Sequence, residues 1–385
     1  MNLTLVLQII FFLLFHAFFA FPSFAKEIKI GLEITQRPVL ISTDKKCDLI
    51  NLSTNRIIQT IGKYKQVKAE NINGLIKLSL NQNSPVVLGA FQGPVKVSSG
   101  KNGIKSYNNK WYRGEIILST NNDTKNLTVV NNIELEDYLL SVVPSEIPSK
   151  WNKEVLKAQA VAARSYSIGY LGRRKEKGYD LESTIEDQVY LGISSEKKST
   201  SDAVRTTKDL ILFDNENNPL ITLYHASGGG YTDSIENIWD KKSSPHIQPC
   251  PDYDDNSPYF KWFRTYEKAK ISEMLKDFKL GEIKDIKPLS RSEANRVKWI
   301  KIIGTNGEKK IRGDDFRRAL KLPSAKFNLT VENNKIKFAG RGNGHGLGMS
   351  QWGAKALAEK GFNYKQILAH YYPGAKLARL VEIKR

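Results

Sequence analysis

The sequence predicts an α+β protein that is predominantly antiparallel β, with a long alanine-rich helix and a C-terminal helical pair that form a groove. Short apolar runs separated by turn residues fill the first third of the chain, which is the pattern of antiparallel strands. An alanine-rich helical run begins near residue 153, and two helical runs with stop signals close the chain. The chain has 385 residues, 40% of them hydrophobic, so it can bury a large core.

The first 25 residues differ from the rest. Residues 3–21 are almost wholly apolar, and Ser23 and Ala25 precede the charged Lys26. Small residues at these positions predict a secretory signal peptide that is cleaved after Ala25. No Lys or Arg precedes the apolar run, and the run is long enough to stay in a bilayer, so an uncleaved membrane anchor is the alternative. In either case we expect an extracytoplasmic protein that is secreted, periplasmic or associated with the cell wall.

The β-rich N-terminal region is expected to span residues 26–125. Strands are predicted at residues 28–32, 75–80 and 114–118, with turn-rich segments between them. The remainder, residues 126–385, has no internal repeat and no low-complexity linker. This favours one interwoven unit over separable domains.

The long helix is predicted from about residue 153 to residue 171. Asn152 is its expected N-cap, and its alanines leave little bulk, so neighbouring elements can pack close to it. Two polar side chains, Gln159 and Arg164, interrupt this small-residue surface.

Further elements are predicted from residue 210 onward. Strands are expected at 210–213 and 220–224, and a helix near 271–278. The C-terminal helical pair is expected at 350–360, stopped by Gly361, and at 364–371, stopped by Pro373 and Gly374.

The formal net charge of +19 falls entirely after residue 25. Such a surplus favours a polyanionic partner, although it also serves simply to keep a protein soluble. Export and the scatter of the basic residues argue against nucleic acid, which leaves an anionic envelope polymer or a membrane surface. A membrane partner is expected only if the N-terminal segment is uncleaved.

Only two cysteines occur, Cys47 and Cys250. An oxidising compartment would permit a disulfide, and two free thiols are the equal alternative. No Cys/His cluster has zinc spacing, so neither a metal nor a cofactor is expected.

Glu146 is the first candidate for chemistry. Two valines, Val142 and Val143, are predicted to end a strand that leads into a turn between Pro144 and Pro148. Proline on either side limits backbone freedom, which suits a positioned acid or base. A solvated turn glutamate is the alternative.

Glycine occupies every second position from 340 to 348. In an extended segment, one face would be bare backbone and the other would carry Arg341, Asn343, His345 and Leu347. Glycines inside a strand lower its stability, because the backbone loses more conformational entropy on folding. Close approach of a ligand or of another backbone is expected to compensate for this loss. A purely structural role, in which the glycines admit the alanine-rich helix, is the alternative.

Known glycine-containing motifs do not fit this segment. The spacings of dinucleotide and phosphate loops are absent, so nucleotide binding is unsupported. A serine-hydrolase elbow also fails, because Trp352 stands where that motif requires glycine.

Residues 224–232 form a third segment, in which a strand ends in a triple-glycine turn that carries His225 and Ser227. A loop that flanks a groove is favoured over a catalytic Ser/His pair, because no known spacing supports such a pair.

Several motifs in order resemble those of one family. Residues 136–139, 142–148 and 154–166 resemble the signature of the stage II sporulation protein D / LytB family. Residues 344–354 and 367–374 are similar to its C-terminal signature, so the resemblance covers nearly all of the chain after the N-terminal segment.

The resemblance implies work on peptidoglycan. Sporulation members are lytic transglycosylases, and LytB members are enhancers of an N-acetylmuramoyl-L-alanine amidase. The family's catalytic glutamate lies in the segment that matches residues 145–148, so Glu146 inherits that role. Ser227 stands where many members have cysteine, which puts a metal or disulfide role there in doubt.

The resulting expectation is an exported lytic transglycosylase that acts on peptidoglycan glycan strands. Glycosidases normally use two carboxylates. Here one is well placed, so Glu146 would serve as both acid and base and leave 1,6-anhydro-muramic ends. The alternative is a non-catalytic wall-binding protein that enhances a cell-wall amidase. The residues expected to bind substrate are Gln159, Arg164, His225, Ser227, Arg341, His345, Ser350 and Gln351.

Overall fold

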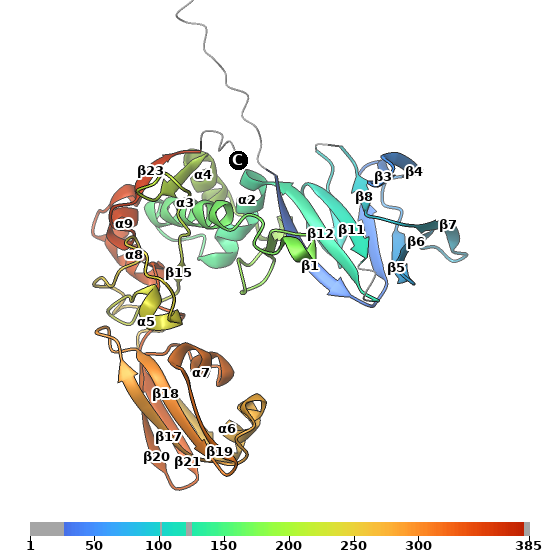
Figure 1. The fold of residues 1–385 in the computed structure, drawn as a ribbon. Helices are drawn as coiled ribbons and strands as arrows, with labels where there is room; N and C mark the ends of the chain where they lie inside the picture. Colours follow the sequence, from blue (N-terminus) through green and yellow to red (C-terminus); the bar gives the residue numbers. More distant parts are fainter. Residues whose placement is uncertain (1–26, 101, 121–124, 381–385) are drawn as a thin grey trace, which may run out of the picture.

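The computed structural model describes residues 27–100, 102–120 and 125–380. These residues form three lobes (Figure 1): a β lobe (residues 27–134), a central body (residues 135–261 and 341–380) and an inserted lobe (residues 262–340). The predicted α+β class with mostly antiparallel strands is confirmed. The predicted signal peptide or anchor, residues 1–25, lies outside the described residues. Within the described part, no helix combines the length and apolarity needed to cross a bilayer.

The β lobe consists of two antiparallel sheets. Its strands are β1 (Glu27–Thr35), β2 (Val39–Thr43), β3 (Cys47–Asn51), β4 (Arg56–Ile61), β5 (Val67–Ile72), β6 (Leu75–Leu80), β7 (Val86–Phe91), β8 (Val95–Ser98), β9 (Lys105–Tyr107), β10 (Lys110–Tyr112), β11 (Glu115–Thr120) and β12 (Leu127–Glu134). A short strand from the central body, β13 (Leu181–Glu182), extends the first sheet. The strand orders are β13-β1-β12-β11-β8-β3-β4 and β10-β9-β2-β5-β6-β7.

Alternating side chains hold these sheets in one core. Ile30, Leu49 and Leu78 are fully buried in the same hydrophobic cluster, as period-two patterning requires. The strands predicted at 28–32, 75–80 and 114–118 correspond to β1, β6 and β11 and are confirmed.

The central body is helical. Its helices are α2 (Leu135–Glu146), α3 (Lys153–Gly169), α4 (Lys198–Thr206), α5 (Ile235–Trp239), α8 (Gln351–Glu359) and α9 (Tyr364–Tyr371). Its short 3-10 turns are η1 (Lys175–Lys177) and η2 (Ile193–Ser195), and its strands are β14 (Leu210–Phe213), β15 (Tyr224–His225), β22 (Met349–Ser350) and β23 (Lys376–Arg379). Strand β14 pairs antiparallel with β23, and β15 pairs parallel with β22.

Helix α3 lies at the centre of this body and packs against α2, α4, α8 and α9. Its alanines are fully buried, which confirms the close packing expected of them. Asn152 accepts a hydrogen bond from the Glu154 amide at 2.9 Å, so the predicted N-cap is also confirmed. The C-terminal pair, α8 and α9, begins and ends within one residue of the predicted bounds.

The strand predicted at 220–224 is wrong for most of its length. Only Tyr224 belongs to β15, and residues 220–223 belong to no strand. This segment lies against α3 instead, where the Thr222 hydroxyl donates to the Ala162 carbonyl at 2.6 Å. An apolar run that packs on a helix looks the same in sequence as a buried strand.

The strand and turn predicted before Pro148 are also wrong, because residues 135–146 form helix α2. The helical signal is present in the sequence. Apolar residues recur at spacings of three and four and are buried on one face, namely Leu135, Tyr138, Leu139, Val142 and Val143. Pro144 lies in the last turn, and the helix ends two residues later, so Glu146 is the final residue of a buried helix.

The inserted lobe has its own hydrophobic core. Its strands are β16 (Trp262–Glu267), β17 (Ile283–Arg291), β18 (Val297–Gly304), β19 (Gly307–Arg312), β20 (Phe327–Glu332) and β21 (Lys335–Gly340). Its helices are α6 (Lys268–Met274) and α7 (Gly313–Ala319), with the turn η3 (Lys276–Phe278). The strand orders are β16-β21-β20 and β17-β18-β19, and Ile300, Phe316 and Phe338 lie between them. The helix predicted near 271–278 corresponds to α6 and η3.

Buried polar contacts join the inserted lobe to the central body. The fully buried guanidinium of Arg296 donates to the Gly228 carbonyl at 2.8 Å, and the Lys326 ammonium donates to the Gly229 carbonyl at 2.9 Å. The triple-glycine turn is therefore the surface on which the inserted lobe rests. The domain division predicted at residue 125 stays a prediction.

Candidate functional site

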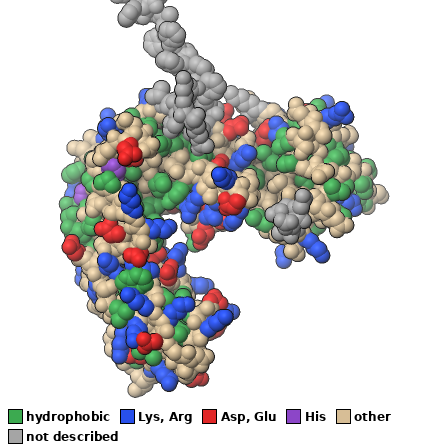
Figure 2. Space-filling model, in the orientation of Figure 1, with side chains coloured by type: hydrophobic (Ala, Val, Ile, Leu, Met, Phe, Trp, Pro, Cys, Tyr) green, Lys and Arg blue, Asp and Glu red, His purple; other side chains and the backbone are tan. Residues whose placement is uncertain are grey.

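A cleft of about 1470 Å³ lies between the central body and the inserted lobe. Figure 2 shows the molecule hollowed between these two parts. The central body contributes Glu146, the end of α3, residues 185–187, Val189 and residues 223–226. The inserted lobe contributes α7 and the start of β16. Segments far apart in sequence therefore meet at one cavity. The predicted groove, formed by the alanine-rich helix and the C-terminal helical pair, differs from this cleft, to which α8 contributes only Gln351 and α9 nothing.

Glu146 lies half-buried in this cleft at the carboxyl end of α2. The Val189 amide donates to its Oε1 at 3.0 Å. Burial raises the pKa of Glu146 to about 7, and the Val189 hydrogen bond opposes part of that rise. The carboxyl end of a helix also disfavours an anion, because the helix dipole is negative there.

A buried hydrogen-bond network lies beside Glu146. The Gln188 side chain accepts from the Tyr138 hydroxyl at 3.3 Å and from the Ser167 hydroxyl at 2.8 Å. Its amide donates to the Tyr224 hydroxyl at 2.9 Å. Burial, and after it the charge of Glu146, raises the pKa of Tyr138 and of Tyr224, so both phenols stay neutral beside the carboxyl group. These contacts fix Gln188 and, through the chain, the adjacent Val189 amide.

Other carboxylates along the cleft are held differently. Asp187 pairs with Arg173 at 2.8 Å, and Asp314 pairs with Arg317 at 2.7 Å. Asp315 likewise pairs with an arginine, and Glu186 is exposed. Glu146 differs because it is half-buried and bonded to a neutral amide, and a carboxyl group in that setting keeps its proton near neutral pH.

Two neutral imidazoles line the cleft. His225 Nδ1 lies 3.1 Å from the Leu347 carbonyl, so it must donate, and its buried Nε2 has no partner among the described residues. His345 Nδ1 accepts from the Leu347 amide at 3.0 Å, so its Nε2 carries the proton. Burial lowers the pKa of His345 to about 4 and that of His225 well below its ordinary value. Both rings are thus suited to hydrogen bonding and not to proton donation.

Gln351, the first residue of α8, also lines the cleft. Its amide lies 3.4 Å from the Gln159 Oε1, and Gln159 is fully buried behind it. Ser350 is buried too, and its hydroxyl caps α8 by accepting from the Gly353 amide at 3.2 Å. Among the predicted binding residues, His225, His345 and Gln351 reach the cleft, while Gln159 and Ser350 support its wall.

The remaining predicted residues lie elsewhere. The Arg164 guanidinium is fully buried and pairs with Glu136 at 2.7 Å, so it ties α3 to α2 and does not face the cleft. The Ser227 hydroxyl is buried and donates to the Asp254 carboxylate. Arg341 is exposed and lines a different hollow on the inserted lobe.

The glycine-rich segment is not extended, so the single face predicted for Arg341 and His345 is wrong. Gly342, Gly344, Gly346 and Gly348 all have positive φ, which breaks the two-residue alternation. The predicted close approach is present, however. A Cβ at Gly346 would lie 2.3 Å from the Arg296 guanidinium. Gly342, Gly344 and Gly348 instead lie against residues 223–229 of the central body. The glycines therefore admit Arg296 of the inserted lobe and this neighbouring segment, and not the alanine-rich helix.

Sequence reasoning missed several lining residues. Tyr166 and Tyr170 lie one helical turn apart at the end of α3, and this i, i+4 aromatic spacing was an available signal. The Val189 amide had no such signal, because a backbone donor is set by conformation alone. In the part of the chain that the structure describes, no group of three His, Cys, Asp or Glu residues converges as a metal site.

Two family models match parts of the chain. The stage II sporulation protein model (SpoIID) matches residues 123–213, which include Glu146 and α3. A second model, a domain of unknown function (DUF8618), matches residues 250–348, which include the inserted lobe.

Similar proteins span most of the chain. An uncharacterised protein of Brachyspira hyodysenteriae is 32% identical over 69% of this chain and 72% of its own length. Stage II sporulation protein D of Bacillus amyloliquefaciens is 32% identical over 65% of this chain and 75% of its own length. An amidase enhancer of Bacillus subtilis is 31% identical over 62% of this chain, which spans 40% of that protein. The chain belongs to the stage II sporulation protein D / LytB family, as its motifs predict.

Proposed function

We propose that this protein is exported and cleaves the glycan strands of peptidoglycan as a lytic transglycosylase. One observation carries the proposal: a half-buried glutamate, Glu146, has a pKa of about 7 and opens into a cleft of about 1470 Å³. A cleft of this size accommodates several sugar units. The similarity to proteins named stage II sporulation protein D and amidase enhancer supports a role in peptidoglycan processing.

In the proposed reaction, protonated Glu146 gives its proton to the glycosidic oxygen as the bond from C1 of N-acetylmuramic acid breaks. The C6 hydroxyl of the same sugar attacks C1, and the Glu146 carboxylate takes the hydroxyl proton. A bond between C1 and O6 forms, so the product is a 1,6-anhydro sugar and the glutamate is regenerated. Because the substrate supplies its own nucleophile, a second carboxylate is not required. General acid–base help of this kind contributes roughly 10²–10⁴-fold.

The neutral groups around Glu146 suit a sugar substrate. His225 Nε2 is an acceptor without a partner among the described residues, and His345 Nε2 carries a proton. With the Gln351 side chain they line the cleft, so a sugar there meets uncharged polar groups. Tyr166 and Trp239 add aromatic surface to the cleft wall.

A second candidate is a wall-binding protein that enhances a cell-wall amidase without cutting glycan. The observation that favours it is the similarity to the amidase enhancer of Bacillus subtilis. In that case the cleft would bind glycan strands, and the partner would be the amidase.

The test uses purified sacculi incubated with wild-type protein and with Glu146→Gln. We expect the substitution to reduce anhydro-muropeptides about 100-fold or more, as measured by mass spectrometry, because the amide cannot exchange the proton. Binding to sacculi should persist, since the amide keeps the shape of the side chain. Unchanged product from Glu146→Gln would exclude the lytic reaction.

Glu186→Gln is the matched comparison, because Glu186 is an exposed carboxylate of the same cleft. It should keep anhydro product within about twofold of wild type, since the lytic reaction needs one carboxylate. A second experiment adds a cell-wall amidase and distinguishes the enhancer from the lytic enzyme. If wild type and Glu146→Gln both stimulate amide cleavage and neither gives anhydro product, the protein is an enhancer.

A further inference from the structure

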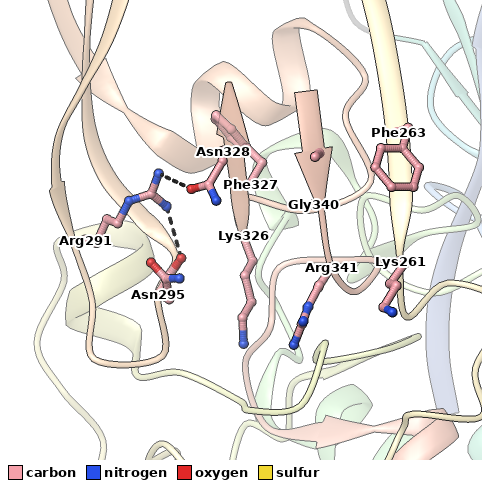
Figure 3. A pocket seen from close by; sticks show the side chains of 10 residues that line it. Lys261, Phe263, Arg291, Asn295, Lys326, Phe327, Asn328, Gly340 and Arg341 are labelled. Atoms are coloured by element: carbon pink, nitrogen blue, oxygen red, sulfur yellow. Dashed lines mark hydrogen bonds between the residues drawn. The ribbon is translucent and has the colours of Figure 1, made fainter. Parts of the chain in front are cut away.

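A second hollow, of about 530 Å³, lies on the inserted lobe where β16, β20 and β21 meet the turn between β17 and β18 (Figure 3). Its lining is basic and includes Lys261, Arg291, Lys326 and Arg341. Figure 3 shows the Lys326 and Arg341 side chains extending side by side, one just before β20 and the other just after β21. The Arg341 amide donates to the Lys326 carbonyl at 2.9 Å, so these two cations lie opposite each other across the strand pair. Like charges in that arrangement destabilise a sheet.

No carboxylate among the described residues forms an ion pair with any of these cations. Their contacts are neutral: Arg291 donates to Asn328 Oδ1 at 3.1 Å, and Arg341 lies 5.4 Å from the Phe260 ring. Burial, Arg296 and Arg341 lower the pKa of Lys326 to about 8, as expected where positive charge is not neutralised.

Two acids lie near enough to act on Lys326, but both are already bonded elsewhere. Asp254 accepts the amides of Gly229 and Gly230, each at 2.8 Å. Asp233 accepts the Asn237 amide at 2.8 Å and the Ser292 hydroxyl. The basic hollow therefore keeps a positive field that an external anion would neutralise.

The hollow adjoins the cleft. Lys261 and Phe263 line both, whereas Arg291, Lys326 and Arg341 line only the hollow. The Phe263 side chain is 71% exposed and stands between the two cavities. An exposed aromatic ring at this place offers a flat apolar surface to a sugar. A chain that leaves the cleft on this side would pass over Phe263 to reach the cations.

We propose that this hollow is a binding site for carboxylates carried by the glycan strand, separate from the site of cleavage. The identity of the ligand rests on the proposed function. N-acetylmuramic acid carries a lactyl group, whose carboxylate is free where the stem peptide has been removed. Where the peptide remains, its own carboxylates are free. Arginine and lysine bind both through the same charge-assisted hydrogen bonds.

The test measures binding of soluble glycan fragments to Glu146→Gln protein, which prevents turnover. Three ligands are compared: intact strands, peptide-stripped strands, and stripped strands whose carboxylates have been converted to methylamides. We expect the methylamide strands to bind about tenfold or more weakly than the better of the other two, because the charge is lost. Tighter binding by stripped strands assigns the hollow to the lactyl carboxylate, and tighter binding by intact strands assigns it to the peptide.

Arg341→Gln and Arg291→Gln, each added to Glu146→Gln, locate the effect. Each should weaken binding of carboxylate-bearing strands about threefold to tenfold and leave methylamide strands unaffected. Lys337→Gln is the control, since Lys337 is a cation of the same strand β21 that pairs with Glu332 at 2.6 Å. Equal binding of all three ligands, or an equal loss from Lys337→Gln, would overturn the proposal. Cleavage is measured in a separate experiment that compares wild type with Glu146→Gln. Failure of the lytic reaction would appear there, and failure of this site would appear in the binding measurements.

Discussion

At the scale of single residues, the environment of Glu146 separates it from the other acids of the cleft. Asp187 and Asp314 lie beside arginines, whereas Glu146 has the Val189 amide and neutral phenols around it. An arginine partner favours the carboxylate, and burial without one favours the carboxylic acid. The structure therefore distinguishes acids that hold the cleft together from the acid that can exchange a proton near neutral pH.

The raised pKa of Glu146 predicts how stability depends on pH. Below about pH 4.5 the Glu146 carboxyl group is protonated in both the folded and the unfolded chain, so it does not lower the free energy of unfolding. As pH rises toward about 7, the unfolded chain ionises first and the folded protein loses stability. Glu146→Gln removes this loss, so it should be more stable than wild type at pH 8, by on the order of 1–3 kcal/mol.

Denaturant unfolding of both proteins at pH 4 and pH 8 measures this difference. Asp252 also has a pKa raised, to about 6, by burial and by Asp254, but it is present in both proteins and cancels in the comparison. A stability difference that is the same at both pH values would contradict the assignment.

At the scale of elements, the glycine-rich segment at 340–348 allows the central body and the inserted lobe to pack together. Gly346 has φ of +86°, and its missing Cβ leaves room for the Arg296 guanidinium. Arg296 in turn donates to the Gly228 carbonyl, so one glycine admits the contact that holds the inserted lobe on the triple-glycine turn. This contact is one of several that hold the two lobes together, with those of Lys326 and Ser292.

Gly346→Ala should therefore destabilise the protein by about 3 kcal/mol or more, through backbone strain together with displacement of Arg296. Gly361→Ala is the matched control, because Gly361 has φ of +91° and open space around its missing Cβ. It should cost only the backbone strain, about 1–2 kcal/mol. Denaturant unfolding measures both variants, and equal losses would show that Arg296 does not set the cost at residue 346.

At the scale of the whole molecule, the lobes are held by packing and hydrogen bonds without a covalent link between cysteines. Cys47 is buried in the β lobe, Cys250 lies in the central body, and both thiols are free. The sequence left a disulfide and free thiols equally open, and the structure supports the free thiols.

Two free thiols predict that reductant leaves the thermal unfolding temperature unchanged. Burial raises the pKa of Cys250 to about 11 and also raises that of Cys47, so neither thiol should react with a disulfide reagent at pH 8 in the folded protein. Both should react in guanidinium chloride. A loss of stability on reduction, or fewer than two reactive thiols after unfolding, would contradict the structure.

Much of the fold was predictable from local patterns. Helices α3, α8 and α9 were located because apolar spacing, caps and glycine stops act within a few residues. Helix α2 was missed because the prolines at 144 and 148 were given more weight than the helical spacing before them. The segment at 220–223 was misassigned because its apolar residues contact α3, which is distant in sequence.

The candidate site was predictable to a similar extent. Motif resemblance led to Glu146, and the structure places it in the cleft with His225, His345 and Gln351. An arginine among alanines is conspicuous in sequence, and it predicts Arg164 as a sugar ligand. Its partner Glu136 lies on another helix, so only the folded chain shows the ion pair that occupies it.

The sequence by itself determined the α+β class, the positions of helices α3, α8 and α9 and the family, because these depend on residue patterns along the chain. Only the tertiary structure decided that Glu146 is a half-buried acid with a pKa of about 7, because burial depends on what packs around it. It also decided which polar residues face the cleft and brought Arg341 and Lys326 together in a second, basic hollow. Charge and burial act through space, so Glu146 and His345 contribute to one cleft although about 200 residues separate them in the sequence.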